Sequence, residues 1–260
     1  MKILVTITEA RSVDTIFEID GLDIDDRYLS SDLNEWDAYA LEEAVRRTED
    51  EGGEVVAVTI GPEGVEGTIR QTLAKGADRA IRVWDEQLAA LDLLDPLTKA
   101  AVLGAVVDAE RPDLVFTGVQ SGDDAFGATP IALASTLGWA WGTVVNDLRL
   151  EASVAHVHRE LEGNLEELTD VERPAVLSIQ TGINEPRHAS LRDVTEAQQA
   201  DIAVRDLADL GLGGDALTSS IDQTALYEPE REGEATIYEG SPEETAAELA
   251  TVIEETGVMQ

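Results

Sequence analysis

A glycine-rich stretch with two adjacent aspartates, residues 118–130, has the residue types of a nucleotide-binding loop. Its three glycines would let the backbone approach a ligand closely. Asp123 and Asp124 can accept hydrogen bonds from a ribose or an adenine, and a helix that begins near Thr129 would offer its free N–H groups to a phosphate. The same stretch would also serve as a polar turn that only connects a strand to a helix. The residues that we expect to contact a nucleotide are Gly118, Val119, Gln120, Ser121, Gly122, Asp123, Asp124, Gly127, Ala128 and Thr129.

Residues from the first quarter of the chain are expected to face the same loop. Thr6 lies at the end of one predicted strand, Ile60 ends another, and residues 34–37 begin a predicted helix. In an open parallel sheet, ligands bind past the carboxyl ends of the strands, near the point where the strand order reverses. Each residue alone is typical of a cap or a turn, but together they predict one adenine-nucleotide pocket. Its expected members outside the loop are Thr6, Asn34, Glu35, Trp36, Asp37 and Ile60.

Other kinds of active site lack their residues in this sequence. No G-x-G-x-x-G follows the first strand and no G-x-x-x-x-G-K-[ST] is present, so two common phosphate cradles are missing. The chain has no cysteine, which excludes disulfides, iron–sulfur ligation and thiol nucleophiles. His156 and His158 would lie on one face of a strand, but we expect exposed histidines and no metal site. No Ser-His-Asp or paired-carboxylate pattern stands out, and we therefore expect no catalytic residues.

The elements that would position the pocket residues alternate between strands and helices. Asn34-Glu35-Trp36-Asp37 has the pattern of an N-terminal capping box, and Asp95-Pro96 would also cap and open a helix. This alternation predicts a doubly wound, mostly parallel α/β sheet of the Rossmann-like, nucleotide-binding type. The runs 154–160 and 165–168 leave no room for a helix and predict an antiparallel hairpin at the sheet edge. The other expected strands are 3–7, 55–60, 80–84, 114–117 and 174–179, and the expected helices begin near residues 34, 62, 95 and 129.

The last quarter of the chain carries fewer core-forming residues. We therefore expect a nucleotide-binding domain, residues 1–200, and a C-terminal linker and arm, residues 201–260, with a hinge at residues 211–214. Ser241-Pro242-Glu243-Glu244 begins a short amphipathic helix within that arm. A lone helix of this size is marginally stable, so it should dock either on a second subunit or back on its own domain.

The composition is strongly acidic: 54 Asp+Glu against 18 Lys+Arg give a formal net charge of -36. This charge argues against nucleic-acid binding, which requires a basic surface. Lysine occurs only at positions 2, 75 and 99, and we interpret the carboxylate-rich surface as an adaptation to high salt, with partner steering as the alternative. No apolar run approaches the roughly 20 residues that span a bilayer. Since the N-terminus also lacks a signal-peptide pattern, we expect a cytoplasmic protein that is not membrane-embedded.

A second candidate site follows the last predicted strand. It consists of Asn184, Glu185, Pro186, Arg187 and the nearby Leu191. One interpretation is a rigid proline turn whose arginine lies in solvent. The other is a preorganised projecting loop whose Leu191 gives a protein partner an apolar anchor.

Several motifs of the chain, taken in order, resemble those of the electron transfer flavoprotein β-subunit family. The resemblance covers residues 2 to about 200, and the tail is looser. Its most specific part is similar to the family's R-E-x-x-G-G-x-E, L-P-A-V-x-T and N-E-P-R-Y signature. The stretches that carry it are 158–166, 173–178 and 184–187, with 61–62, 68–70 and 74–79 as a second block.

This resemblance implies an electron carrier without chemistry of its own. In such a carrier, residues 118–129 and 34–37 would hold AMP, and the redox FAD would be shared with an α subunit on which the arm docks. Residues 184–191 would dock flavin dehydrogenases, such as acyl-CoA dehydrogenases, and electrons would pass to a membrane quinone reductase. An electron-bifurcating member, with FAD in place of AMP, is the first alternative.

Two alternatives come from other classes. A stand-alone ATP-binding module of the universal stress type shares this sheet architecture, but it requires a G-x-x-G stretch and a following G-[ST] that the chain lacks. An enzyme that uses the loop aspartates as acid and base would require a perturbed pKa.

Overall fold

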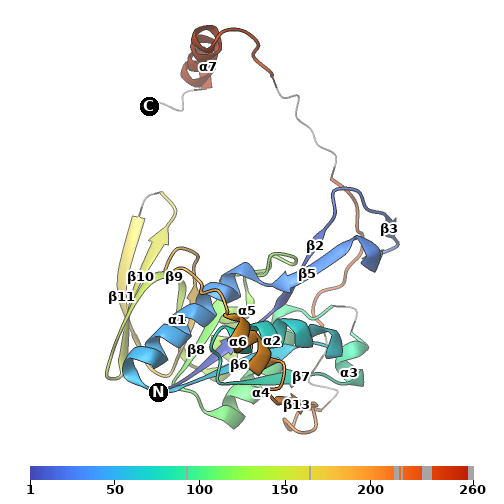
Figure 1. The fold of residues 1–260 in the computed structure, drawn as a ribbon, viewed down its shortest axis with the longest axis vertical. Helices are drawn as coiled ribbons and strands as arrows, with labels where there is room; N and C mark the ends of the chain where they lie inside the picture. Colours follow the sequence, from blue (N-terminus) through green and yellow to red (C-terminus); the bar gives the residue numbers. More distant parts are fainter. Residues whose placement is uncertain (92, 164, 214–216, 218, 230–235, 257–260) are drawn as a thin grey trace. The chain divides into compact units, whose positions relative to one another are not determined.

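The computed structural model describes the chain except residues 92, 164, 214–216, 218, 230–235 and 257–260 (Figure 1). The chain divides into two units, Met1–Leu226 and Tyr227–Gln260. The first unit contains the sheet and the candidate pocket. The described part of the second contains one helix, α7 (Pro242–Thr256).

A nine-stranded sheet forms the centre of the first unit. Its strands are β1 (Lys2–Thr6), β6 (Glu54–Ile60), β7 (Arg79–Val83), β8 (Leu114–Gly118), β9 (Ala140–Glu151), β10 (Val154–Leu161), β11 (Leu165–Glu172), β12 (Ala175–Ile179) and β13 (Ile202–Arg205). They lie in the order β11-β10-β9-β12-β8-β1-β6-β7-β13, and all neighbours from β9 to β13 are parallel. The chain passes from β1 to β6 and β7 and returns on the other side of β1 through β8 and β12. The strand order therefore reverses at β1, where a ligand crevice is expected.

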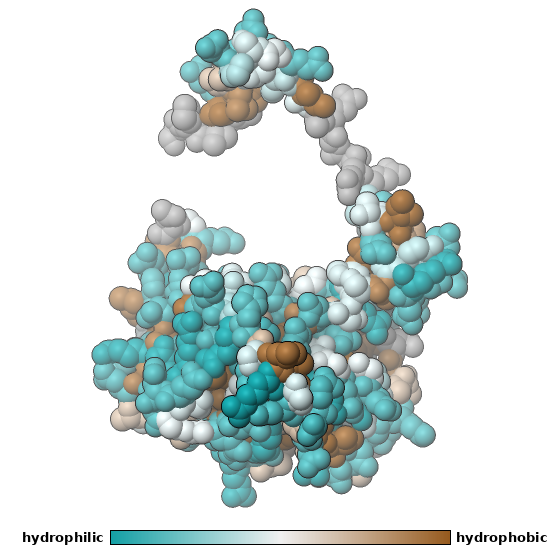
Figure 2. All heavy atoms as spheres, viewed as in Figure 1, coloured by the Kyte–Doolittle hydropathy of each residue, from teal (hydrophilic) through white to brown (hydrophobic). Residues whose placement is uncertain are grey.

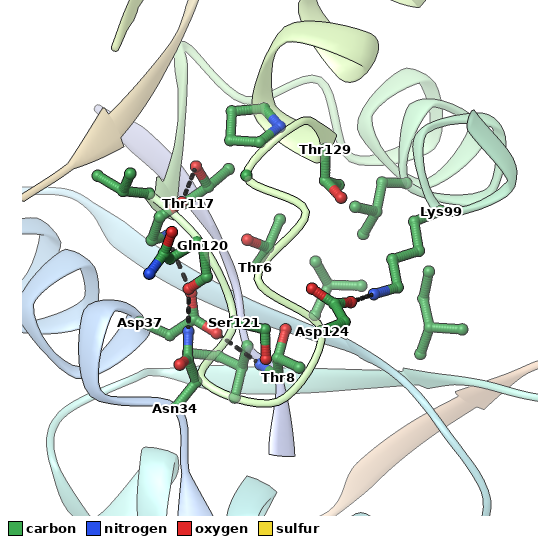
Figure 3. Close-up of a pocket in the computed structure, with 18 of the residues that line it drawn as sticks. Thr6, Thr8, Asn34, Asp37, Lys99, Thr117, Gln120, Ser121, Asp124 and Thr129 are labelled. Atoms are coloured by element: carbon green, nitrogen blue, oxygen red, sulfur yellow. Dashed lines mark hydrogen bonds and ion pairs between the residues drawn. The ribbon is translucent and has the colours of Figure 1, made fainter. Parts of the chain in front are cut away.

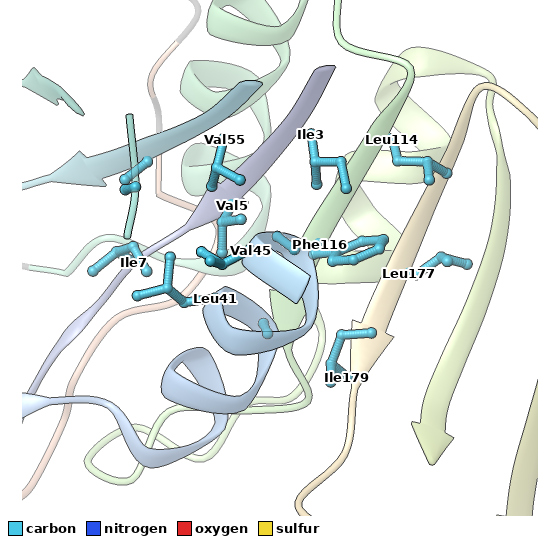
Figure 4. Close-up of a cluster of buried hydrophobic side chains, with 14 of the residues drawn as sticks. Ile3, Val5, Ile7, Leu41, Val45, Val55, Leu114, Phe116, Leu177 and Ile179 are labelled. Atoms are coloured by element: carbon cyan, nitrogen blue, oxygen red, sulfur yellow. The ribbon is translucent and has the colours of Figure 1, made fainter. Parts of the chain in front are cut away.

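Helices cover both faces of this sheet. They are α1 (Glu35–Glu51), α2 (Glu66–Ala74), α3 (Glu86–Ala89), α4 (Pro96–Glu110), α5 (Thr129–Leu137) and α6 (Leu191–Ala197). Alternate residues of β1 point to opposite faces. Ile3 and Val5 pack with Phe116 against α1 and α2, as Figure 4 shows in part, whereas Leu4 packs under α4 and α5. The doubly wound α/β prediction is confirmed, and the buried strands read as continuous apolar runs because both faces are covered.

The predicted edge hairpin is also confirmed, since β10 and β11 are antiparallel and β11 lies at the edge. The sequence did not predict β9, a strand of 12 residues that joins this hairpin to the parallel sheet. The register of β9 shifts against both neighbours, and Val144 has a positive φ of 58°. These irregularities break the simple two-residue alternation by which such a strand would be recognised.

A second region without a sequence prediction lies between β1 and α1. Here β2 (Glu9–Val13) pairs with β5 (Leu29–Leu33) in a separate two-stranded sheet. The short strands β3 (Ile19–Asp20) and β4 (Asp23–Ile24) form another pair between them. This excursion brings the chain back to the start of α1, beside the carboxyl end of β1.

The compact unit extends beyond the expected domain boundary at residue 200. Strand β13 pairs with β7 at the edge of the main sheet, and Leu207 and Leu217 are buried in the core under α4. Of the expected hinge, residue 214 lies outside the described residues. In the second unit, Ser241 and Glu244 form the predicted capping box at the start of α7.

Hydrophilic residues occupy most of the face of the first unit shown in Figure 2. Among the described residues, no helix is both long and apolar enough to cross a membrane.

Candidate functional site

A pocket lies at the carboxyl ends of β1, β6 and β8, where the strand order reverses (Figure 3). Eleven of the predicted residues line it: Thr6, Asn34, Asp37, Ile60, Gly118, Val119, Gln120, Ser121, Asp124, Gly127 and Thr129. Five predicted residues lie near it without lining it: Glu35, Trp36, Gly122, Asp123 and Ala128. The two segments that the sequence analysis paired, 34–37 and 118–129, are thus brought together. Their contact with a nucleotide stays a prediction.

Asp37 is the buried acid that joins three segments of the chain at this pocket. Its Oδ2 accepts a hydrogen bond of 2.8 Å from the amide of Thr8, and its Oδ1 accepts one of 2.9 Å from the amide of Gly118. The side chain is almost completely buried. This burial raises the pKa of Asp37 to about 6, although the hydrogen bonds from Thr8, Asn34 and Gly118 oppose the shift. Asp37 therefore fixes the start of α1 against the ends of β1 and β8.

Asn34 precedes α1 as expected, but the predicted capping box is wrong. Its side chain makes no capping hydrogen bond to the helix. Instead, Nδ2 donates to the Gln120 carbonyl at 2.9 Å, and Oδ1 accepts from the Gly122 amide at 3.2 Å. Asn34 and Asp37 thus bind neighbouring loops rather than the helix itself. The pattern for an N-cap and the pattern for such a tether use the same residue types.

Gly118 allows α1 to approach the end of β8 closely. A Cβ at this position would lie 2.6 Å from Oδ1 of Asp37 and 2.6 Å from Cβ of Trp36. Trp36 contributes to this packing from outside the pocket, and its Nε1 donates to Gln180 Oε1 at 3.1 Å. Close approach of two backbones is the structural reason for glycine here.

The two loop aspartates have different roles. Asp123 accepts hydrogen bonds from Ser121 Oγ and from the amide of Arg11, so it secures the loop to β2. Burial raises its pKa, but these hydrogen bonds outweigh burial and leave the pKa below its usual value. Asp124 lines the pocket and forms an ion pair of 2.6 Å with Lys99 of α4 (Figure 3).

The sequence analysis missed eight residues that line the pocket: Ile7, Thr8, Val58, Leu94, Lys99, Leu103, Thr117 and Pro130. Several of them, such as Val58 and Leu103, have the sequence pattern of core residues. Only the packing of α4 against β6 in the folded chain places them at the pocket. Lys99 had one available signal, because it is one of only three lysines in the chain. It also lies four residues after Asp95, whose predicted cap is confirmed by a bond of 2.7 Å from the Thr98 amide.

The second candidate site, residues 184–191, is held against α1. Arg187 binds two acids of this helix: its Nε donates to Glu42 Oε2 at 2.8 Å and its Nη1 to Glu49 Oε1 at 2.7 Å. Burial alone would raise the pKa of Glu42, but the bonds from Arg187 and Arg46 lower it. The pKa of Arg187 is raised, because its hydrogen bonds to Glu49 and Glu42 stabilise the charged guanidinium. The interpretation with the arginine in solvent is therefore wrong.

The same loop also presents the predicted apolar side chain to the surface. Asn184 donates to the Tyr39 carbonyl at 3.0 Å, and the Arg46 guanidinium donates to the Glu185 carbonyl at 3.4 Å. Just beyond, Leu191 begins α6 and is 84% exposed. Residues 184–187 thus form a rigid base for an exposed leucine.

The hairpin histidines are partly buried and lie beside acids rather than being fully exposed. The Nδ1 atom of His156 lies 2.5 Å from Asp170, and Nε2 of His158 lies 3.4 Å from Glu166. Their side chains are 29% and 25% exposed. Across the ranges that the structure describes, no group of three or more metal-ligating side chains is suited to hold an ion.

Comparisons with known proteins place these features in context. The model of the electron transfer flavoprotein domain matches residues 21–210. The electron transfer flavoprotein subunit beta of Methylophilus methylotrophus is 42% identical, over 98% of each chain. The subunits of the same name from Bradyrhizobium diazoefficiens and Mus musculus are 34% and 35% identical, over 88% and 86% of this chain and 90% and 85% of theirs.

Proposed function

Because the chain belongs to the electron transfer flavoprotein family as a β subunit, an electron carrier rather than an enzyme, we propose that its pocket binds a structural AMP. It pairs with an α subunit, and the two share a redox-active FAD. The complex carries electrons from acyl-CoA and related dehydrogenases to a membrane quinone reductase, in the cytoplasm of a salt-adapted organism.

The observation that supports this proposal is the pocket at the point of strand reversal. Its residues fit an adenine nucleotide, because apolar side chains from β6 and α4, including Val58 and Leu103, face hydroxyls such as Thr129 and the polar loop 118–124. Apolar walls with a few placed polar groups are typical of small-molecule sites. The close contact at Gly118 and the two bonds of Asp37 hold these segments together.

This chain supplies binding and positioning. FAD, when bound with the α subunit, supplies the electron-accepting chemistry. The absence of cysteine means that the chain has no thiol redox couple of its own. A nucleotide in the pocket would connect β1, α1 and the loop after β8, and would stabilise the folded subunit in proportion to its affinity.

We assign partner docking to the loop 184–191. Its support is the combination of a base fixed by Arg187 and a leucine that is 84% exposed. Preorganisation lowers the entropic cost of association, and one apolar anchor can dominate the binding energy.

The experiment that tests the proposal is a nucleotide count on the complex. The chain would be co-expressed with its α subunit, purified in high salt and denatured, and the FAD and AMP released per heterodimer would be quantified. One FAD and one AMP are expected. Two FAD and no AMP would show a bifurcating carrier, and a monomer that releases only ATP would overturn the electron-transfer proposal in favour of a stress-type module.

The C-terminal unit is proposed to dock on the α subunit. Its helix α7 begins with a capping box, and Leu249 on this helix is 51% exposed. A chain truncated after Leu226 keeps the whole described sheet, so its thermal unfolding should change little while the heterodimer dissociates more readily in analytical ultracentrifugation. Equal heterodimer stability with and without residues 227–260 would contradict this role.

A further inference from the structure

Lys99 is the one cationic side chain among the described residues that line the nucleotide pocket. It projects from the second turn of α4 toward the loop after β8, and its ammonium lies 2.6 Å from Asp124 Oδ2 (Figure 3). In that view the pair lies at one end of the pocket, and Asn34 and Asp37 lie toward the other. Both side chains are 22% exposed, so the charge is partly shielded from solvent.

The position of Lys99 is fixed from both sides. The start of α4 is locked by Asp95, which accepts from the amides of Thr98 at 2.7 Å and Ser220 at 2.6 Å. Asp124 is held by its loop, because its Oδ1 accepts from the Phe126 amide at 3.1 Å. The ion pair uses one of the three donors that an ammonium carries. Two donors of the ammonium therefore remain for a bound anion.

The loop after β8 offers few side-chain hydrogen-bond donors to an anion at the Lys99 end of the pocket. Between Asp124 and Thr129 it reads Ala125-Phe126-Gly127-Ala128, which contains no side-chain hydrogen-bond donor. The pocket also contains the acids Asp37 and Asp124, and the whole chain carries a net charge of -36. A phosphate would be repelled here unless a local cation offsets this field.

The rarity of lysine in this chain makes its presence in the pocket more informative. Of 18 basic residues only three are lysine, and the other two form contacts away from this pocket. Lys2 pairs with Glu110, and Lys75 donates to the Arg187 carbonyl at 2.7 Å. An ammonium is a compact point charge on a flexible stem, whereas a guanidinium is a planar fork.

From these observations, and resting on the proposed function, we propose that Lys99 binds the phosphate of the nucleotide in this pocket. It thereby selects a phosphorylated adenine nucleotide over the uncharged nucleoside. A charge-assisted hydrogen bond of this kind contributes roughly 10- to 100-fold in affinity. The residue is a specificity determinant for the ligand and takes no part in electron transfer.

The test is calorimetric titration of the nucleotide-free heterodimer with AMP and with adenosine. Lys99→Met should weaken AMP binding roughly 10- to 100-fold and change adenosine binding by less than about twofold. Arg192→Met is the matched control, because it removes one positive charge from a side chain that is 82% exposed on α6. Its AMP affinity should equal that of the wild type.

The outcomes separate this inference from the proposed function. If the wild type binds neither AMP nor adenosine, both proposals fail. If the wild type binds AMP but Lys99→Met weakens AMP and adenosine equally, or neither, only the role of Lys99 is overturned.

Discussion

At the scale of single residues, the pocket is assembled by short polar side chains that join neighbouring segments. Asn34 tethers α1 to the loop at residues 120–122, and Asp37 tethers the same helix to the ends of β1 and β8. These bonds satisfy backbone groups that would otherwise be buried without partners. The start of α1 is therefore both a helix terminus and one wall of the pocket.

The buried carboxyl of Asp37 should make the stability of the protein depend on pH. Its folded pKa is raised from 3.8 to about 6, so the folded state binds the proton more tightly than the unfolded state does. The free energy of unfolding gained from this group is full below pH 3.8 and is lost as the pH rises through 6. A shift of this size corresponds to about 3 kcal/mol.

Asp37→Asn cannot titrate, and its amide NH₂ would face a backbone donor, so the variant should be less stable at every pH. The informative quantity is the slope. Between pH 4 and pH 7 the wild type should lose about 2 kcal/mol more unfolding free energy than the variant, measured by urea denaturation at each pH. Parallel pH profiles for the two proteins would show that Asp37 titrates normally.

Gly118 should tolerate no side chain. In Gly118→Ala the new Cβ would meet Asp37 and Trp36 at 2.6 Å, which forces α1 away from β8. We expect a loss of about 1–3 kcal/mol in unfolding free energy, as for other overpacked sites, together with weaker AMP binding. Gly67→Ala is the control, because Gly67 is an exposed position of helix α2 and nothing lies within 4 Å of its added Cβ. That variant should be more stable by up to about 1 kcal/mol, and a similar response of both variants would contradict the packing argument.

The sequence analysis identified many of the polar residues that line the pocket, but it did not predict their hydrogen bonds. Asn34 and Asp37 were expected at the pocket because they begin a helix near the strand ends, and both line it. Their hydrogen-bond partners at residues 8, 118, 120 and 122 lie far from α1 along the chain, and no local motif connects them to it. The capping pattern therefore predicted the wrong hydrogen bonds for Asn34. Val58 and Leu103 were missed because an apolar residue that lines a pocket has the same sequence pattern as an apolar residue of the core.

At the scale of elements, α1 connects the two candidate sites. Its first turn forms the pocket wall through Asp37, and its later turns carry Glu42 and Glu49, which bind Arg187 of the loop 184–191. Glu42 is only 5% exposed, so the Arg187 pair offsets the cost of a nearly buried charge. A rigid helix thus supports both the pocket and the exposed Leu191.

Leu191→Ala should separate docking from folding. Because this side chain is 84% exposed, the free energy of unfolding should change by less than about 0.5 kcal/mol. If Leu191 is an anchor, kcat/KM for reduction of the heterodimer by its partner dehydrogenase should fall about tenfold, which corresponds to about 1.4 kcal/mol of lost contact. Leu168→Ala, at 81% exposure on β11, is the matched control and should leave that rate unchanged. Equal rates in all three proteins would place docking elsewhere.

The sequence predicted the parallel strands from β12 to β7 and most of the helices that cover them. It did not predict β9 or the segment between β1 and α1. Buried parallel strands such as β1 and β8 read as unbroken apolar runs between turn residues. Strand β9 bends at Val144 and shifts register, and β2 is largely exposed, so neither has a clean period. Strand β13 was overlooked because it is a short, mostly exposed edge strand whose pairing with β7 is visible only in three dimensions.

At the scale of the whole molecule, the excess of acidic residues sets the conditions under which the fold is stable. A net charge of -36 on 260 residues produces repulsion that opposes the compact state. Local ion pairs such as Arg187 with Glu42 and Arg79 with Glu54 reduce it, but the chain has too few cations to pair most of its acids. The remaining repulsion acts over the Debye length, which falls from about 10 Å at 0.1 M salt to about 3 Å at 1 M.

The thermal stability should therefore rise with salt. Between 0.1 M and 2 M KCl we expect Tm, followed by circular dichroism, to increase by at least about 3 °C, which corresponds to about 1 kcal/mol for a chain of this size. The matched control carries Asp108→Lys, Glu160→Lys and Asp201→Lys, three exposed positions of the first unit that lie on α4, on β10 and just before β13. Each substitution replaces a negative charge by a positive one, so the repulsion that salt can screen is smaller and the rise in Tm should be smaller. An equal rise in both proteins would assign the salt effect to hydrophobic burial, and a falling Tm would refute the interpretation of the acidic surface as an adaptation to salt.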